Sequence, residues 1–386
     1  MAINSEQQQQ IDQLFLELSN ANETCIGYPL SKDFDYSPLY KFFEYSINNV
    51  GDPYEGSNLK TQTHNIEKEV IDFFGKLLGA DPSDYWGYVT HGGSESNLYS
   101  LYVARELYPN AIVYYSDQTH YCVKKAINLL NVESIMICSQ DNGEIDYKDL
   151  EETLKVNRSK PAIIVANFGT TMTEAKDDIS KMKAIFKKLA IQDHHIHCDA
   201  ALSGAYGSFI TPRIPFDLAD GADSVSISGH KFIGSPTPSG VLLTKRSLRD
   251  RIARKIDVVG SIDTTIAGSR NGHSSLFLWY AIKNMGVQGL RERYEHSLMV
   301  SNYCLDKLKS IGINAWKVPG AITVVFPKVA NDIKTKWQLA TVGDISHIVC
   351  MPSVTVEQID EFVNDLMAKE SKTKQKSKEL LTADFI

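Results

Sequence analysis

Short apolar runs alternate with amphipathic helical patterns throughout residues 85–245. The runs are rich in β-branched and aromatic residues and too short for buried helices, which is typical of strands joined by crossover helices. Strands of this kind are buried on both faces and belong to a mostly parallel sheet covered by helices. The expected strands are seven: residues 86–90, 111–115, 134–138, 162–166, 195–199, 223–227 and 240–244.

The sequence pattern changes after about residue 245. Long helical patterns at 276–285 and 290–310 lead to two strand patterns and a closing helix at 355–368, which together predict a small α+β domain. The last residues are rich in Lys, Ser and Glu and predict a polar tail. The expected organisation is an N-terminal arm at 1–60 that packs on a partner subunit, a large domain at 61–275, a small C-terminal domain at 276–368 and a tail at 369–386.

Composition excludes several classes of protein. The formal net charge of -7 disfavours a nucleic-acid binder, which is usually basic. No run of about 18 apolar residues predicts a membrane span, and the N-terminus lacks the basic and apolar regions of a signal peptide. The 6 cysteines have no paired spacing. They predict reduced thiols in a cytoplasmic protein.

Candidate binding residues follow the strands, because ligands of open parallel sheets bind beyond the carboxyl ends of the strands. After the first strand, Gly92, Gly93 and Ser94 open a helix whose free N–H groups suit a phosphate. The alternative is an ordinary Gly-Ser helix start. After the second strand comes His120, which is either a flat ring that stacks on a cofactor or a polar residue at a helix N-terminus.

Two charged residues follow later strands. Asp199 ends a strand and precedes small residues, where a buried carboxylate is costly unless it is paired with a cation. Lys231 lies in a tight Gly- and Pro-bounded turn between two buried strands. Exclusion from water lowers the pKa of a lysine amine, as a lysine that bonds to a carbonyl carbon requires. Taken alone, an exposed turn lysine is the commoner case.

The stretch His194–His197 also invites a metal interpretation, because His195 and His197 share one face of a strand. No second group of ligands has suitable spacing, so we expect no zinc site. The four sites at one sheet edge instead match the needs of pyridoxal 5'-phosphate (PLP). The phosphate of PLP needs backbone N–H donors, and its ring needs a side chain that stacks on it. The ring nitrogen needs a carboxylate to stay protonated, and the aldehyde needs an amine to bond with.

Eight short motifs carry a resemblance to a known family. The chain resembles the fold type I PLP-dependent group II amino-acid decarboxylases, and within them the bacterial histidine decarboxylases and plant serine decarboxylases. The likeness extends over residues 25–365. The motifs are Gly27-Tyr28-Pro29, Ser46-Ile47-Asn48-Asn49, Trp86-Gly87-Tyr88-Val89-Thr90, Asn142-Gly143-Glu144-Ile145-Asp146, Phe168-Gly169-Thr170-Thr171, His197-Cys198-Asp199-Ala200-Ala201-Leu202, Ser228-Gly229-His230-Lys231 and Gly268-Ser269-Arg270-Asn271-Gly272-His273.

The resemblance implies a role for each candidate residue. Lys231 would hold the cofactor covalently, Asp199 would pair with the ring nitrogen and His120 would stack on the ring. The phosphate would be held by Gly93, Ser94, Ser228 and His230, and Ala201 would pack on the far face of the ring. The resemblance also implies a homodimer with active sites at the subunit interface, and the decarboxylation of an L-amino acid, with L-histidine preferred over L-serine.

Two positions depart from the family pattern. The family usually has a tyrosine on the loop after the lysine that returns a proton to Cα, whereas no tyrosine lies between Lys231 and Tyr280 here and Val258 stands in its place. Ala321 replaces a serine on the substrate side. These departures leave open another amino acid as substrate, His230 or a partner residue as proton donor, or an oxidative deamination that follows decarboxylation. A non-catalytic scaffold is disfavoured, because Lys231, Asp199 and His120 are all present.

Overall fold

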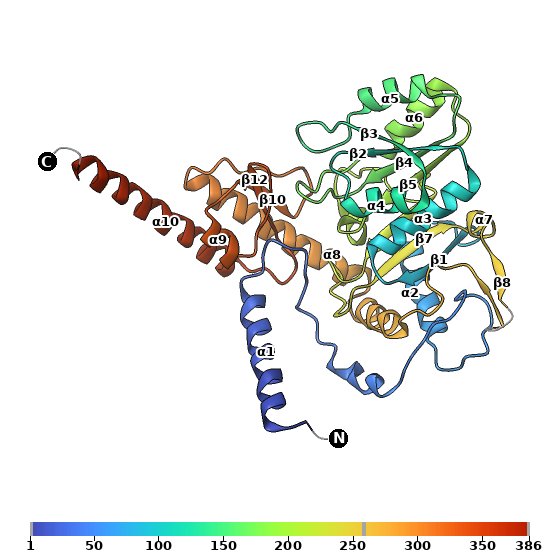
Figure 1. Cartoon of the computed structure of the whole chain (residues 1–386), viewed down its shortest axis with the longest axis horizontal. Helices are drawn as coiled ribbons and strands as arrows, with labels where there is room; N and C mark the ends of the chain where they lie inside the picture. The colour runs from blue at the N-terminus through green and yellow to red at the C-terminus, as the bar shows by residue number, and fades with distance from the viewer. Residues whose placement is uncertain (1–2, 257–259, 384–386) are drawn as a thin grey trace. The chain divides into compact units, whose positions relative to one another are not determined.

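The computed structural model describes residues 3–256 and 260–383 (Figure 1). By packing, the chain divides into two compact units. The larger contains Ser31–His296 and Val318–Gly320, and the smaller contains the chain up to Leu30, Ser297–Lys317 and the chain from Ala321. Within the described ranges, no helix combines the length and apolar character needed to cross a membrane. The domain boundaries that the sequence predicts at residues 60, 275 and 368 stay predictions beside this division.

The larger unit is built on a 7-stranded sheet in the order β1-β7-β6-β5-β4-β2-β3. Strand β7 runs antiparallel to both of its neighbours, β1 and β6, and the other neighbouring pairs are parallel. The predicted α/β fold with a mostly parallel sheet is therefore confirmed. The strands are β1 Tyr85–Thr90, β2 Ile112–Ser116, β3 Glu133–Ile137, β4 Ala162–Asn167, β5 His194–Asp199, β6 Ser224–Ser228 and β7 Gly240–Lys245.

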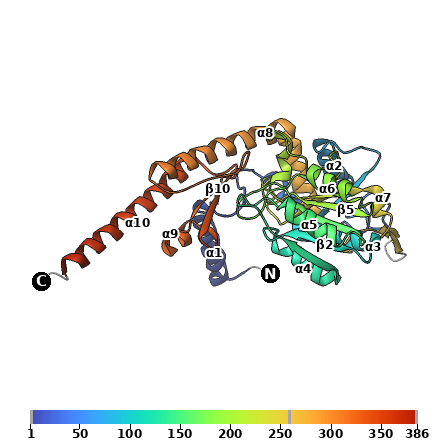
Figure 2. The same cartoon turned by 90° about the horizontal axis from the view of Figure 1, so that it is seen from above.

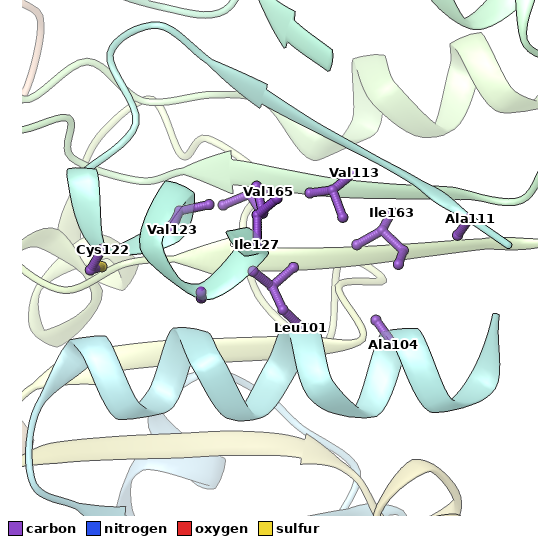
Figure 3. Packing of buried hydrophobic residues seen from close by; sticks show 10 residues of the cluster. Leu101, Ala104, Ala111, Val113, Cys122, Val123, Ile127, Ile163 and Val165 are labelled. Carbon is purple, nitrogen blue, oxygen red and sulfur yellow. The ribbon is translucent and has the colours of Figure 1, made fainter. Parts of the chain in front are cut away.

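Helices cover both faces of this sheet. Helices α3 and α4 lie on one face, and α2 and α6 lie on the other (Figure 2). Apolar side chains of α3 and α4 point toward those of β2 and β4, so the sheet edge that carries the site rests on a packed core (Figure 3). The helices around this sheet are α2 His64–Leu77, α3 Gly93–Leu107, α4 Tyr121–Leu130, α5 Tyr147–Val156, α6 Ile179–Leu189 and α7 Arg246–Arg249.

The larger unit also contains two short strands, three 3-10 helices and helix α8 (Gly272–Ser310) as far as His296, while the rest of α8 belongs to the smaller unit. The strands β8 Arg254–Ile256 and β9 Ser261–Asp263 form an antiparallel pair that the sequence did not predict. Three 3-10 helices are η1 Ser37–Glu44, η2 Ser203–Ala205 and η3 Gly207–Phe209. Helix α8 is interrupted at Gly286, whose φ of 60° suits glycine. The two helices predicted at 276–285 and 290–310 lie on either side of this break.

The smaller unit contains a 3-stranded antiparallel sheet in the order β10-β12-β11. The chain after helix α1 joins this unit through a bond of 2.9 Å from the Val349 N–H to the Ile26 carbonyl. Helix α10 continues to Ala383, beyond the end at residue 368 that the sequence predicts. The elements are α1 Ser5–Glu23, β10 Thr323–Pro327, α9 Asn331–Lys336, β11 Ala340–Val342, β12 Ile345–Val349 and α10 Val356–Ala383.

Candidate active site

The predicted site residues follow four strands at one edge of the sheet. Gly93 and Ser94 come after β1, His120 after β2, Asp199 at the end of β5, and Ser228 to Lys231 at the end of β6. Because β1, β2, β5 and β6 all point the same way, their carboxyl ends place these residues at a common edge.

The turn between β1 and α3 forms a narrow cradle. Gly92 has a φ of +146°, a conformation that L side chains rarely adopt. A Cβ atom on Gly93 would lie 3.0 Å from Ser228 Oγ and 3.7 Å from Ala201 Cβ, so these three residues meet at the start of α3. Gly92 has no side chain to cap the helix. The N–H groups of Glu95 and Ser96 bond to its carbonyl oxygen, so those of Gly93 and Ser94 are the ones that suit an anionic ligand.

Lys231 lies in the turn that joins β6 to β7, as predicted. Burial lowers the pKa of its amine, while the charges of Asp199 and Cys122 act in the opposite direction. A neutral amine is a nucleophile, which the ammonium form is not. The turn is also tightly packed, because a Cβ on Gly229 would lie 2.5 Å from Ser239 Oγ.

His120 caps the N-terminus of helix α4, where its Nδ1 accepts a bond of 3.3 Å from the backbone N–H of Cys122. Burial lowers the pKa of His120, Asp199 opposes that shift and Lys231 adds to it. The ring is therefore neutral at pH 7 and lies within electrostatic reach of both charged residues. The capping role and the predicted stacking role are compatible, since the cap uses only an in-plane nitrogen lone pair.

His230 holds the other side of the lysine turn. Its Nδ1 lies 3.0 Å from the carbonyl oxygen of Ser239, and burial lowers the pKa of the ring. The backbone N–H of Ser239 also lies 3.3 Å from Nδ1, so the Ser239 backbone engages Nδ1 in either tautomer and Nε2 is the nitrogen left to exchange a proton. Of the two departures from the family pattern, Val258 lies outside the described residues. Ala321 is buried in the smaller unit.

Asp199 is held by Ala201, a predicted site residue, and by Asn97, which the sequence prediction missed. Asn97 Nδ2 donates to Asp199 Oδ2 at 2.6 Å, and the backbone N–H of Ala201 donates to Oδ1 at 3.2 Å. The Oδ1 atom of Asn97 accepts bonds of 2.9 Å from both Ser226 Oγ and His197 Nε2. A period-two alternation in the sequence, with polar residues at 195, 197 and 199 and serines at 224, 226 and 228, was the available signal.

The histidines of β5 have partners other than a metal. His197 Nδ1 lies 2.9 Å and His195 Nε2 lies 3.4 Å from the hydroxyl of Ser224. Across residues 3–256 and 260–383, no group of 3 or more His, Cys, Asp or Glu side chains is arranged to hold a metal ion. The serine hydroxyl instead ties both rings to the neighbouring strand.

Known proteins resemble this chain along most of its length. Residues 45–315 match the family model of the pyridoxal-dependent decarboxylase conserved domain. A histidine decarboxylase of Mesorhizobium japonicum is 45% identical over 93% of this chain and 97% of that protein. One of Vibrio campbellii is 41% identical over 95% of this chain and 96% of that protein. Among solved structures, L-methionine decarboxylase from Streptomyces sp.590 superposes with a TM-score of 0.86 at 25% identity, covering 95% of each chain.

Proposed function

The chain belongs to the pyridoxal-dependent decarboxylase family, and from this premise we propose that it converts L-histidine to histamine and CO2. The observation that carries the choice of substrate is the likeness, at 41% and 45% identity over nearly the whole chain, to two proteins that are histidine decarboxylases. The cofactor is PLP, which supplies an electron-withdrawing ring for the charge left at Cα when CO2 departs.

The residues at the sheet edge fit this cofactor. The cradle of Gly93, Ser94 and Ser228 combines free N–H groups with hydroxyls, which suits a phosphate. The buried amine of Lys231 is suited to bond the aldehyde, and Asp199 supplies the negative charge that a protonated ring nitrogen requires. His120 and Ala201 are assigned to the two faces of the ring, and His230 to the phosphate side.

The chain must also deliver a proton to Cα after CO2 leaves. His230 is our candidate, because the Ser239 backbone engages its Nδ1 and leaves Nε2 for proton transfer. Nε2 would first take up a proton from solvent, and the lowered pKa makes the resulting imidazolium a strong enough acid to pass that proton to Cα. The His230→Gln variant keeps a hydrogen-bond donor but cannot release a proton at neutral pH. We expect it to lower kcat about a hundredfold at saturating PLP, with cofactor content measured separately because His230 is also assigned to the phosphate side.

A panel of L-amino acids tests the proposal, with CO2, amine and hydrogen peroxide measured for each one. Histamine formed in a one-to-one ratio with CO2 supports it, and a higher kcat/KM for serine or another amino acid would replace histidine as the substrate. The absence of CO2 from every amino acid would overturn the decarboxylase assignment.

The missing loop tyrosine favours one second candidate, decarboxylation coupled to oxidative deamination. If protonation at Cα is slow, O2 accepts two electrons instead. The amino acid, O2 and H2O then give the aldehyde, CO2, NH3 and H2O2. Aldehyde and peroxide in equal amounts, both abolished under nitrogen, would identify this reaction, and histamine formed equally in air and nitrogen would exclude it.

The proposal includes a homodimer. Helix α1 has no buried residue, and its apolar side chains Ile11, Leu14, Phe15 and Leu18 are each more than half exposed. A second copy of the chain is the partner that the family resemblance implies for this face. Light scattering should give twice the chain mass, and Phe15→Glu should shift the protein toward monomer while Gln9→Glu on the same helix should not.

The free thiols at all six cysteines support a cytoplasmic location.

A further inference from the structure

A row of buried polar side chains lies behind Asp199, between helix α3 and strands β5 and β6. The register pairs His197 with Ser224 and Asp199 with Ser226, so these side chains project from one face of the sheet. Asn97 of α3 meets them there, four residues after Gly93 and on the same face of the helix. We call Asn97, His197, Asp199, Ser224 and Ser226 the Asp199 network.

The hydrogen-bond partners fix the orientation of the Asn97 amide. An ionised Asp199 requires a donor at 2.6 Å, so the amide turns its oxygen toward the Ser226 hydroxyl, which lies 2.9 Å from Asn97 Oδ1 and donates to it. The opposite side of the amide, Nδ2, then faces Asp199 Oδ2 at 2.6 Å and Cys122 Sγ at 3.3 Å. Asn97 therefore offers a donor, and not an acceptor, to the carboxylate.

The same logic fixes the tautomer of His197. Burial lowers the pKa of this ring to about 4, so it is neutral at pH 7 and carries one N–H. Nε2 faces the Asn97 carbonyl oxygen at 2.9 Å and must be the donor, because an amide oxygen only accepts. Nδ1 then accepts from the Ser224 hydroxyl at 2.9 Å, and that hydroxyl can accept from His195 Nε2 at 3.4 Å.

The reversed arrangement belongs to a protonated Asp199. If His197 carried its proton on Nδ1, its Nε2 would need a donor, and the amide of Asn97 would turn its NH2 group toward the ring. The amide oxygen would then face Asp199 at 2.6 Å, a contact that is favourable only if Asp199 bears a proton. The tautomer of one buried histidine is thus coupled through one amide to the charge of the carboxylate.

We infer that His197 and Asn97 are positioning residues that keep Asp199 ionised and directed at the ring nitrogen of PLP. This inference rests on the proposed pairing of Asp199 with that nitrogen. Neither residue is required to touch the cofactor or the substrate. Their effect reaches the reaction through Asp199, because an ionised carboxylate keeps the ring nitrogen protonated and the ring electron-withdrawing.

A matched pair of variants tests the inference in the holoenzyme. Glutamine and methionine have similar size and length, but only the glutamine amide can donate to Asn97 Oδ1 as His197 Nε2 does. The enzyme is loaded with PLP labelled with 15N in the ring, and the 15N chemical shift reports the protonation of that nitrogen. We expect a protonated nitrogen in the wild type and in His197→Gln, and a shift toward the unprotonated value in His197→Met.

Kinetics should follow the same division. His197→Met should lower kcat on the order of tenfold, with KM changed by no more than about twofold, since the lost interaction acts in the transition state. His197→Gln should recover most of kcat. Ser224→Ala is the milder test if His197→Met does not fold. This variant removes the hydroxyl that fixes the tautomer of His197 but leaves the imidazole ring in place. It should lower kcat about threefold and move the 15N shift in the same direction as His197→Met.

Each outcome decides the matter. An unprotonated ring nitrogen in the wild type would overturn both the pairing with Asp199 and this inference. A protonated nitrogen in the wild type and in all variants would overturn the inference and leave the proposed function standing. Equal losses in His197→Met and His197→Gln would assign His197 to packing alone and would also overturn it.

Discussion

Two buried polar groups in the larger unit are constructed differently. In the Asp199 network, neutral side chains are hydrogen-bonded to one another, and the Asp199 carboxylate accepts hydrogen bonds from neutral groups. The second group, which we call the Arg270 cluster, consists of Asn49, Glu67 and Arg270. Arg270 forms an ion pair with Glu67 and donates to the Gly51 carbonyl at 2.9 Å, and Asn49 donates to Glu67 at 2.7 Å.

The difference shows how a buried polar group that only stabilises the fold is distinguished from one that is arranged to bind a ligand. In the Arg270 cluster the two charges neutralise each other, with exposed side-chain fractions of 1% and 0%, and tie α2, β1 and the chain before α8 together. In the Asp199 network the carboxylate is oriented by neutral groups and points to the sheet edge where Lys231 lies. A buried carboxylate held in this way is costly unless it pairs with a cation, and we propose that the protonated ring of PLP is that cation.

The largest effect is expected at Lys231. Lys231→Ala should lower kcat about a thousandfold or more, because the amine that bonds the cofactor is lost. Lys231→Arg is the matched control, since it keeps a positive charge but offers no nucleophilic amine. Borohydride reduction followed by mass spectrometry should fix the cofactor on the Lys231 peptide of the wild type only. Substantial activity in Lys231→Arg would show that the charge alone suffices and would remove the covalent role.

The Arg270 cluster should respond in stability and not in chemistry. Glu67→Gln leaves Arg270 buried without its counter-charge, and should lower the free energy of unfolding by about 3–5 kcal/mol. Glu69→Gln, in an exposed pair with Lys283, should lower it by less than about 1 kcal/mol. Urea unfolding at a fixed PLP concentration measures both, and kcat per folded molecule should be unchanged. Equal destabilisation by the two variants would contradict the assignment of the cluster to stability.

The two regions should also differ in their dependence on pH. The folded pKa of His197, about 4, lies below its ordinary value of 6.5 because of burial. The unfolded chain therefore binds more protons at this residue between these values, and the wild type loses stability as the pH falls from 6.5 to 4. Asp199 and His195 act on the same ring in opposite directions.

Between pH 4 and 6.5, the titration of His197 should change the free energy of unfolding by roughly 3 kcal/mol. His197→Gln should remove this part of the pH dependence. Glu67→Gln should keep the wild-type slope while lowering the whole curve. Urea unfolding at several pH values between 4 and 7 gives both slopes. A slope that is the same in His197→Gln and in the wild type would mean that His197 titrates normally in the folded protein.

The sequence predicted the sheet because its strands are short segments, either continuously apolar or alternating as in β5 and β6, that lie between helical patterns. It did not predict β8 and β9, which are 3 residues each and include Arg254, Lys255 and Asp263. Such charged segments carry no apolar periodicity, and their pairing depends on the partner strand. Strand β11 was missed because 3 residues are too few to show an alternation, and among the described residues it pairs with β12.

The candidate site divides along a similar line. Lys231 and Asp199 were found because a charged residue at the end of an apolar strand stands out in the sequence. Asn97 was missed, because a polar residue inside a helix is ordinary until the register of β5 against β6 is known. His197 was noticed but assigned no role, because its partner Ser224 lies 27 residues away and no local pattern joins the two.

Within the site itself, Asp199 should matter more than His120. Asp199→Ala removes the charge that we propose stabilises the transition state, and should lower kcat on the order of a hundredfold. His120→Ala removes a stacking partner, and should lower kcat about tenfold, in line with the energy of aromatic contacts. Asp199→Asn separates charge from shape, because it keeps the side-chain outline and loses only the charge.

We expect Asp199→Asn to resemble Asp199→Ala and not the wild type, since the donors from Asn97 and Ala201 are arranged for a carboxylate. Steady-state kinetics at saturating PLP, with cofactor content measured for each variant, separate catalysis from cofactor loss. Comparable losses in Asp199→Ala and His120→Ala would show that stacking and charge contribute equally. The carboxylate would then be one support of the ring among several, and the Asp199 network would have to be regarded, like the Arg270 cluster, as a structural group.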